Sequence, residues 1–167
     1  MTKSIPLKEI SESQDRSWSF RLVELLREGH ELSQAQLDDI ASTLAALDDQ
    51  RVLSALSEIL SDDSLAHNVR LAASDALSNS TTYETSKERE QWWQSGDDIL
   101  QRHAVRTAER EEEALITTIA SNPAHPLYGE AIDTLAFWFE PRFQKMITKA
   151  LNHKDREIRE IAARSLL

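Results

Sequence analysis

The 167-residue sequence has no cysteine, only three glycines and four prolines, and no long apolar run. Without cysteine, the chain has no disulfide framework, thiolate nucleophile or thiolate metal site. The scarcity of glycine and proline removes most of the turn signals that hairpins and short strands need. No stretch approaches the roughly 18 to 20 apolar residues of a membrane span, and the first residues lack the apolar region of a secretory signal. These absences predict a soluble, cytoplasmic, all-α protein.

Acidic side chains outnumber basic ones by 29 to 19, which gives a formal net charge of −10. Such a chain repels phosphate backbones and anionic membrane surfaces, so the composition argues against both partners and favours a basic protein. Residues 141–167 are the exception, with seven basic side chains against three acidic ones. Arg142, Lys145 and Lys149 are spaced to share one helix face. Nucleic-acid binding through this C-terminal basic repeat is therefore kept as an alternative.

The sequence offers no recognisable catalytic, cofactor or metal site. Its five histidines are scattered, with no H-E-x-x-H pair, and its three glycines form no phosphate-binding loop. We expect a non-catalytic protein without a cofactor.

Apolar residues recur at helical spacing and in repeated frames. The pattern i, i+3, i+4, i+7, i+8 begins at Leu37 and returns 32 residues later at Val69. It returns more weakly from Leu127 and clearly from Ile158. Each frame follows another amphipathic segment, near 19–29, 50–63, 111–123 and 141–155. Helical pairs that repeat every 30 to 40 residues are typical of an α-solenoid. We therefore predict about four helical hairpins in one domain at 18–167, after a polar N-terminal segment at 1–17.

Two of these frames resemble HEAT repeats, particularly the short bacterial repeats of the phycobilisome-lyase type. The resemblance is carried by "VRLAASDAL" and "IREIAARSLL", each after a turn that contains aspartate. It implies a short right-handed superhelix, a habit of binding other macromolecules, and a structural role in joining neighbouring repeats for five residues: Asp62, Asp63, Arg70, Asp155 and Arg159. An accessory lyase-like or chaperone-like role, as in those relatives, is a further alternative.

The interval between the second and third frames is 58 residues, which predicts an insertion at roughly 79–105. Insertions in repeat proteins often contribute to binding. This one contains Trp92 and Trp93, which either pin the segment to the repeats or present an aromatic anchor to a partner.

Carboxylates at positions between core residues of the second helices are expected to line an acidic groove. We predict that the chain is an interaction scaffold whose groove binds a basic protein, and a small immunity-type protein that neutralises a basic toxin would be one instance. The C-terminal repeat is also a candidate for self-association. The predicted partner-binding residues are Asp38, Asp39, Asp75, Trp92, Trp93, Asp133 and Glu160.

Overall fold

The computed structural model describes residues 5–80 and 88–166, in which all regular secondary structure is helical and no strand occurs. The chain divides into two compact units, Met1–Glu84 and Thr85–Leu167, and each is described by itself. The division falls inside the segment predicted as an insertion. The assignment of 18–167 to a single domain stays a prediction.

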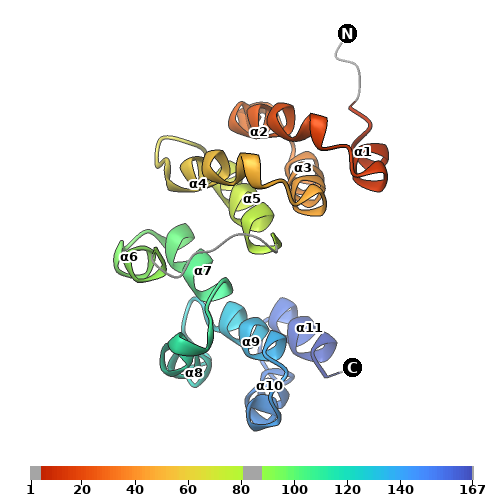
Figure 1. Ribbon diagram of the computed structural model, residues 1–167. Helices are drawn as coiled ribbons and strands as arrows, with labels where there is room; N and C mark the ends of the chain where they lie inside the picture. Colours follow the sequence, from red (N-terminus) through yellow and green to blue (C-terminus); the bar gives the residue numbers. More distant parts are fainter. Residues whose placement is uncertain (1–4, 81–87, 167) are drawn as a thin grey trace. The chain divides into compact units, whose positions relative to one another are not determined.

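The first unit contains five α-helices in its described residues (Figure 1). They are α1 (Leu7–Ser13), α2 (Ser19–Arg27), α3 (Gln34–Leu47), α4 (Leu53–Ser61) and α5 (His67–Ser78). Helix α3 packs against both α2 and α5, and α4 packs against α5, so the predicted helical pairs at 19–45 and 50–77 are present. Within the segment predicted as polar, Leu7–Ser13 forms α1, which packs on α3 and buries Ile10.

The second unit contains six α-helices in its described residues (Figure 1). They are α6 (Arg89–Gln94), α7 (Asp98–Arg106), α8 (Glu113–Ala120), α9 (Tyr128–Phe137), α10 (Gln144–Ala150) and α11 (Arg156–Arg164). Helices α8 to α11 form the two pairs predicted near 111–139 and 141–166. Helices α6 and α7 pack on each other and α7 packs on α9, so the segment interpreted as an insertion contributes a helical pair of its own.

Most first helices of a pair begin with a turn of 3₁₀ helix. These turns lie at Arg16–Trp18, Gln50–Val52, Arg110–Glu112 and Pro141–Phe143, and each continues directly into α2, α4, α8 or α10. A further 3₁₀ turn, Gly29–Glu31, lies between α2 and α3. An acidic residue precedes each of the four entry turns, and the first two of these, Asp15 and Asp49, accept a hydrogen bond from a backbone N–H of the turn. Carboxylates at such positions satisfy N–H groups that have no partner within the helix.

Each unit has an apolar core made by the faces that the periodicity predicts. In the first unit Leu37, Leu44, Val69 and Leu77 are at most 4% exposed. In the second unit the core gathers side chains from α7 to α11, and Tyr128, Ile132 and Leu135 are its largest fully buried members on α9. Gly129 lets α9 approach α11 closely, since a Cβ there would lie 3.2 Å from the Cγ1 atom of Ile158.

Candidate functional site

The predicted acidic residues of the first unit lie on α3 and α5. Asp38 and Asp39 are exposed, and Asp38 accepts a hydrogen bond of 2.7 Å from the Nε2 atom of Gln34. Asp75 is half-buried and already engaged by other groups of the molecule. A hollow of about 360 Å³ between α1 and α3 brings Asp39 near Glu12. The lysine of the Lys8–Glu12 ion pair lines the same hollow, so its charge is mixed.

The other two predicted acids, Asp133 on α9 and Glu160 on α11, are exposed in the second unit. Glu160 forms an ion pair of 2.7 Å with Arg156. Because the five acids are divided between two units that are described separately, the continuous acidic groove stays a prediction.

The two tryptophans of the predicted insertion differ in exposure. Trp92 is only 7% exposed, and its ring meets the ring of His103 edge to face at 4.8 Å. Trp93 is half-buried and packs against the core of the second unit. Trp92 therefore lies in the interior and does not offer an exposed aromatic anchor. Its burial agrees with the interpretation that the tryptophans pin the segment to the repeats.

The two arginines that the resemblance places between neighbouring repeats, Arg70 and Arg159, donate hydrogen bonds within a single helical pair. The Nε atom of Arg70, at the start of α5, donates to the carbonyl of Leu60 in α4 at 2.8 Å. Arg159 of α11 likewise donates to the carbonyls of His153 and Lys154, both at 2.8 Å, in the loop that follows α10. Asp155 accepts from the backbone N–H of Glu157 and so caps α11.

The aspartates before α5 play a more local part. The carboxylate of Asp62 accepts from the backbone N–H and the hydroxyl of Ser64, and these hydrogen bonds lower its pKa. Asp63 is exposed. Asp62 therefore stabilises the turn between α4 and α5.

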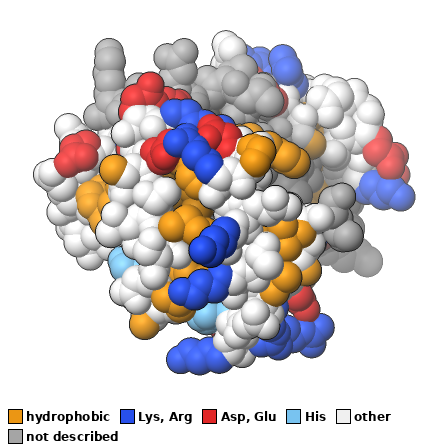
Figure 2. Space-filling view, turned by 90° about the horizontal axis from the view of Figure 1, so that it is seen from below, with side chains coloured by type: hydrophobic (Ala, Val, Ile, Leu, Met, Phe, Trp, Pro, Cys, Tyr) orange, Lys and Arg blue, Asp and Glu red, His pale blue; other side chains and the backbone are white. Residues whose placement is uncertain are grey.

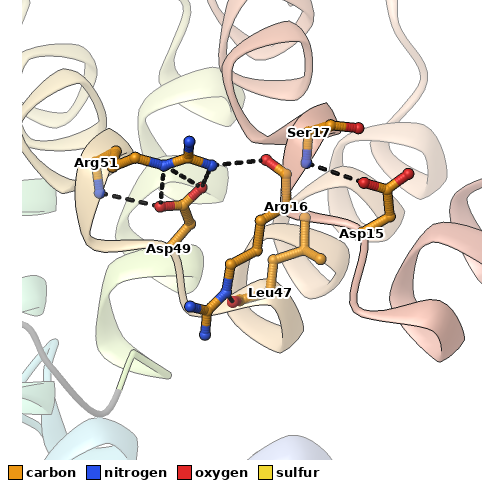
Figure 3. Close-up of polar contacts among 6 residues, drawn as sticks. All are labelled: Asp15, Arg16, Ser17, Leu47, Asp49 and Arg51. Atoms are coloured by element: carbon orange, nitrogen blue, oxygen red, sulfur yellow. Dashed lines mark hydrogen bonds and ion pairs between the residues drawn. The ribbon is translucent and has the colours of Figure 1, made fainter.

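Two polar contacts between neighbouring pairs lie at the starts of the first helices, beside the packing of one second helix on the next. In the first unit the Nη2 atom of Arg51 donates to the carbonyl of Arg16 at 3.0 Å and pairs with the carboxylate of Asp49 at 2.6 Å (Figure 3). The hydrogen bond from Arg51 holds the pKa of Asp49 well below its usual range. In the second unit Arg142 of the last pair contacts Glu113 at 2.6 Å at the start of α8.

A second arginine pattern, which the repeat analysis missed, closes individual pairs. An arginine at the start of the first helix donates to a carbonyl at the end of the second. Figure 3 shows one such bond, from Arg16 to Leu47. The three bonds are Arg16 to Leu47 at 2.9 Å, Arg89 to Thr107 at 3.1 Å and Arg110 to Trp138 at 2.7 Å. The buried guanidinium of Arg89 also pairs with Glu109 and Glu112, both at 2.9 Å.

The most exposed large apolar side chains in the described ranges flank the end of α9. Phe137 is 82% exposed and Phe139 is 87% exposed, whereas Trp138 between them is buried at 9%. The guanidinium of Arg110 lies 4.6 Å from the centre of the Trp138 ring and also holds the Trp138 carbonyl. Trp138 is thus fixed inward, and both phenylalanines are directed away from the core.

Phe139 also has an unusual backbone conformation, with φ of +52°. It follows the last residues of α9 at the position where helices commonly place glycine or asparagine in the left-handed conformation. Beside it lies a hollow of about 280 Å³, whose apolar wall is formed by side chains of α9, α10 and the end of α11. Leu135, Ile147 and Leu166 are among the residues that line it.

The structure shows no helix, in the residues it describes, that is long and apolar enough to cross a membrane. Within those same ranges no group of three or more histidine and carboxylate side chains is arranged to hold a metal ion. Neither the known family models nor the curated proteins or solved structures include a match to this chain.

Proposed function

We propose that this chain is a non-catalytic protein–protein interaction module whose partner covers Phe137 and Phe139. The observation that carries the proposal is the conformation and exposure of Phe139. Its phenyl ring is 87% exposed in a backbone conformation with φ of +52°.

Phe139 adopts a backbone conformation that is unfavourable for a residue with a side chain. No burial of its ring offsets that cost. The left-handed conformation costs a residue with a side chain about 1 to 2 kcal/mol, which glycine avoids. Burial of a phenyl ring contributes about 1.5 to 3 kcal/mol, but an exposed ring forgoes this gain. Violations of this kind are concentrated where a side chain serves binding or catalysis. A partner that buries Phe137 and Phe139 would supply the missing gain.

The expected partner is a protein with an apolar surface flanked by basic groups. Asp133 is exposed on α9 and precedes Phe137 by four residues, so both share one face of the helix. A lysine or arginine of the partner would meet this carboxylate while the aromatic rings are buried. Complementary charge of this sort raises the association rate and selects the partner more than it raises affinity. Neutralisation of a basic toxin is one instance of such a function.

The proposed architecture is a short right-handed α-solenoid of the HEAT type. The successive helical pairs, their 3₁₀ entries and the arginine contacts between neighbouring pair starts support this proposal. A cytoplasmic location and the accessory lyase-like alternative stay predictions.

Affinity capture from the native cell extract tests the function. We expect the parent chain to capture a basic protein and the double variant Phe137→Gln with Phe139→Asn to lose it. Asparagine tolerates the left-handed conformation, so the fold should persist by circular dichroism. Phe20→Gln is the matched control, since Phe20 is 53% exposed in the first unit. Equal capture by the double variant and the parent would contradict the proposal.

A further inference from the structure

Two neighbouring hollows lie beside helix α10 and the loop after it in the second unit. The first, of about 400 Å³, lies where the loop after α8 meets the loop after α10, and its residues include Tyr128 and Lys154. The second, of about 630 Å³, runs along α10 from Pro141. Lys149 and Asn152 line both, so the two hollows adjoin. No aspartate or glutamate lines either one.

Three lysines border these hollows, and their ammonium groups have no carboxylate partner in the described ranges. They are Lys145, Lys149 and Lys154, all exposed. The nearby arginine is different, because Arg142 pairs with both Glu113 and Glu140. The nearest carboxylate in sequence, that of Asp155, accepts from the backbone of Glu157. The positive charge of the lysines is therefore available to a ligand.

The wall of the first hollow is fixed by hydrogen bonds from both of its loops. The Nδ1 atom of His153 accepts from the backbone N–H of Asp155 at 3.1 Å, so its Nε2–H is the group that donates to the carbonyl of Pro123 at 3.0 Å. The His153 ring also stacks on Tyr128, with centroids 5.3 Å apart. Because this wall is already ordered, a ligand would not have to order it on binding.

We propose that this lysine-lined groove binds an extended acidic peptide segment of a partner protein. Lys145 and Lys149 are one helical turn apart, a rise of about 6 Å. Alternate residues of an extended peptide are about 6.7 Å apart, so two acids separated by one residue match the two lysines. An apolar side chain of the same peptide fits the first hollow, against Pro123, Ala124 and Tyr128. Figure 2 shows apolar side chains beside Lys and Arg side chains on the face of the molecule seen from below.

A short acidic peptide suits this groove better than a nucleic acid does. Residues 85–167 carry 12 basic and 14 acidic side chains, and the whole chain has a net charge of −10. A long polyanion would be repelled beyond the three lysines, whereas a peptide with two or three acids ends within them. The groove is a second contact, which adjoins the hollow beside Phe139 because Pro141 and Gln144 line both, and its charge is opposite to that of Asp133.

Selection of peptides tests the inference. A phage-displayed library of random 12-residue peptides is panned on the immobilised full-length chain, and the affinity of each enriched peptide is measured by fluorescence polarisation. We expect enriched peptides to carry acids at alternate positions beside an apolar residue. Lys149→Glu should weaken them about tenfold, because it removes an attraction and adds a repulsion. Lys8→Glu, an equal change of charge on an exposed lysine of the first unit, should leave affinity unchanged.

Ala124→Trp tests the apolar hollow without changing charge. It should lower the affinity of the same peptides, because the indole ring would occupy the space that their apolar side chain needs. Enriched peptides that are basic, or that bind Lys149→Glu as well as Lys8→Glu, would overturn the proposal. A fluorescein-labelled 12-nucleotide single strand that binds more tightly than the peptides and depends on Lys149 would assign the groove to nucleic acid instead. Sedimentation that shows a dimer lost in Lys149→Glu would assign it to a second copy of the chain.

Discussion

The buried histidine of α7 makes the stability of the second unit depend on pH. His103 is 0% exposed and contacts Trp92, and burial lowers its pKa from 6.5 to about 3. The nearby positive charge of Arg106 acts in the same direction. The folded chain therefore keeps this histidine neutral at pH values where the unfolded chain protonates it.

The sign and the size of the effect follow from the two pKa values. Between about pH 6.5 and pH 3 the unfolded state binds one more proton, so the free energy of unfolding falls as the pH falls. The slope approaches about 1.4 kcal/mol per pH unit, and the loss between pH 7 and pH 5 is about 2 kcal/mol. Above pH 6.5 the histidine is neutral in both states and adds no pH dependence. The lowered pKa of Asp49 acts in a different window, below its unfolded value of 3.8.

Urea unfolding followed by tryptophan fluorescence measures this slope. In a Trp18→Phe background the remaining tryptophans, Trp92, Trp93 and Trp138, all belong to the second unit. We expect His103→Leu to abolish most of the slope between pH 7 and pH 5, whatever its effect on absolute stability. His67→Gln, at an exposed position on α5, should retain the slope. If His103→Leu kept the parent's pH dependence, the neutral buried histidine would not be its source.

Three further predictions concern packing, strain and closure. Ala73 and Ala162 are both 0% exposed, so Ala73→Leu and Ala162→Leu should each destabilise by about 1 to 3 kcal/mol through overpacking; unchanged melting temperatures would contradict this. Phe139→Gly should raise the free energy of unfolding in urea by about 1 kcal/mol, because it relieves the left-handed backbone; a loss of stability would show that the phenyl ring contributes to the fold. Arg110→Met should lower the stability of the second unit by about 1 to 3 kcal/mol, since the carbonyl of Trp138 loses its donor, and an unperturbed urea midpoint would refute this role.

The helical pairs were predictable because local periodicity reports burial directly. Leu37, Ile40, Ala41 and Leu44 are all at most 5% exposed, as their spacing predicts. Helix α6 was harder to predict because it has only six residues, which is too short for a period to be recognised in a polar segment. Its two tryptophans are shielded from solvent by His103 and by the core of the second unit. These contacts between distant residues cannot be read from local periodicity.

The exposed pair Phe137 and Phe139 was missed for a related reason. The stripe of Tyr128, Ala131, Ile132 and Leu135 continues at either position 138 or position 139 by helical spacing. The helix ends at Phe137, Trp138 turns inward under Arg110, and the left-handed residue that follows directs the next ring outward. Three consecutive aromatics in "FWF" were the available signal, since three such rings cannot all face one core.

The arginine bonds that close individual pairs also bear on how the chain folds during synthesis. Arg16 and Leu47 are 31 residues apart, and Arg110 and Trp138 are 28 apart. At about 5 to 20 residues per second a ribosome adds such a length in roughly 1.5 to 6 seconds, whereas helices form in microseconds. A pair can therefore complete its closing bond soon after its second helix leaves the exit tunnel. Nascent apolar faces would then be exposed one pair at a time, which limits the contacts that lead to aggregation on a crowded polysome.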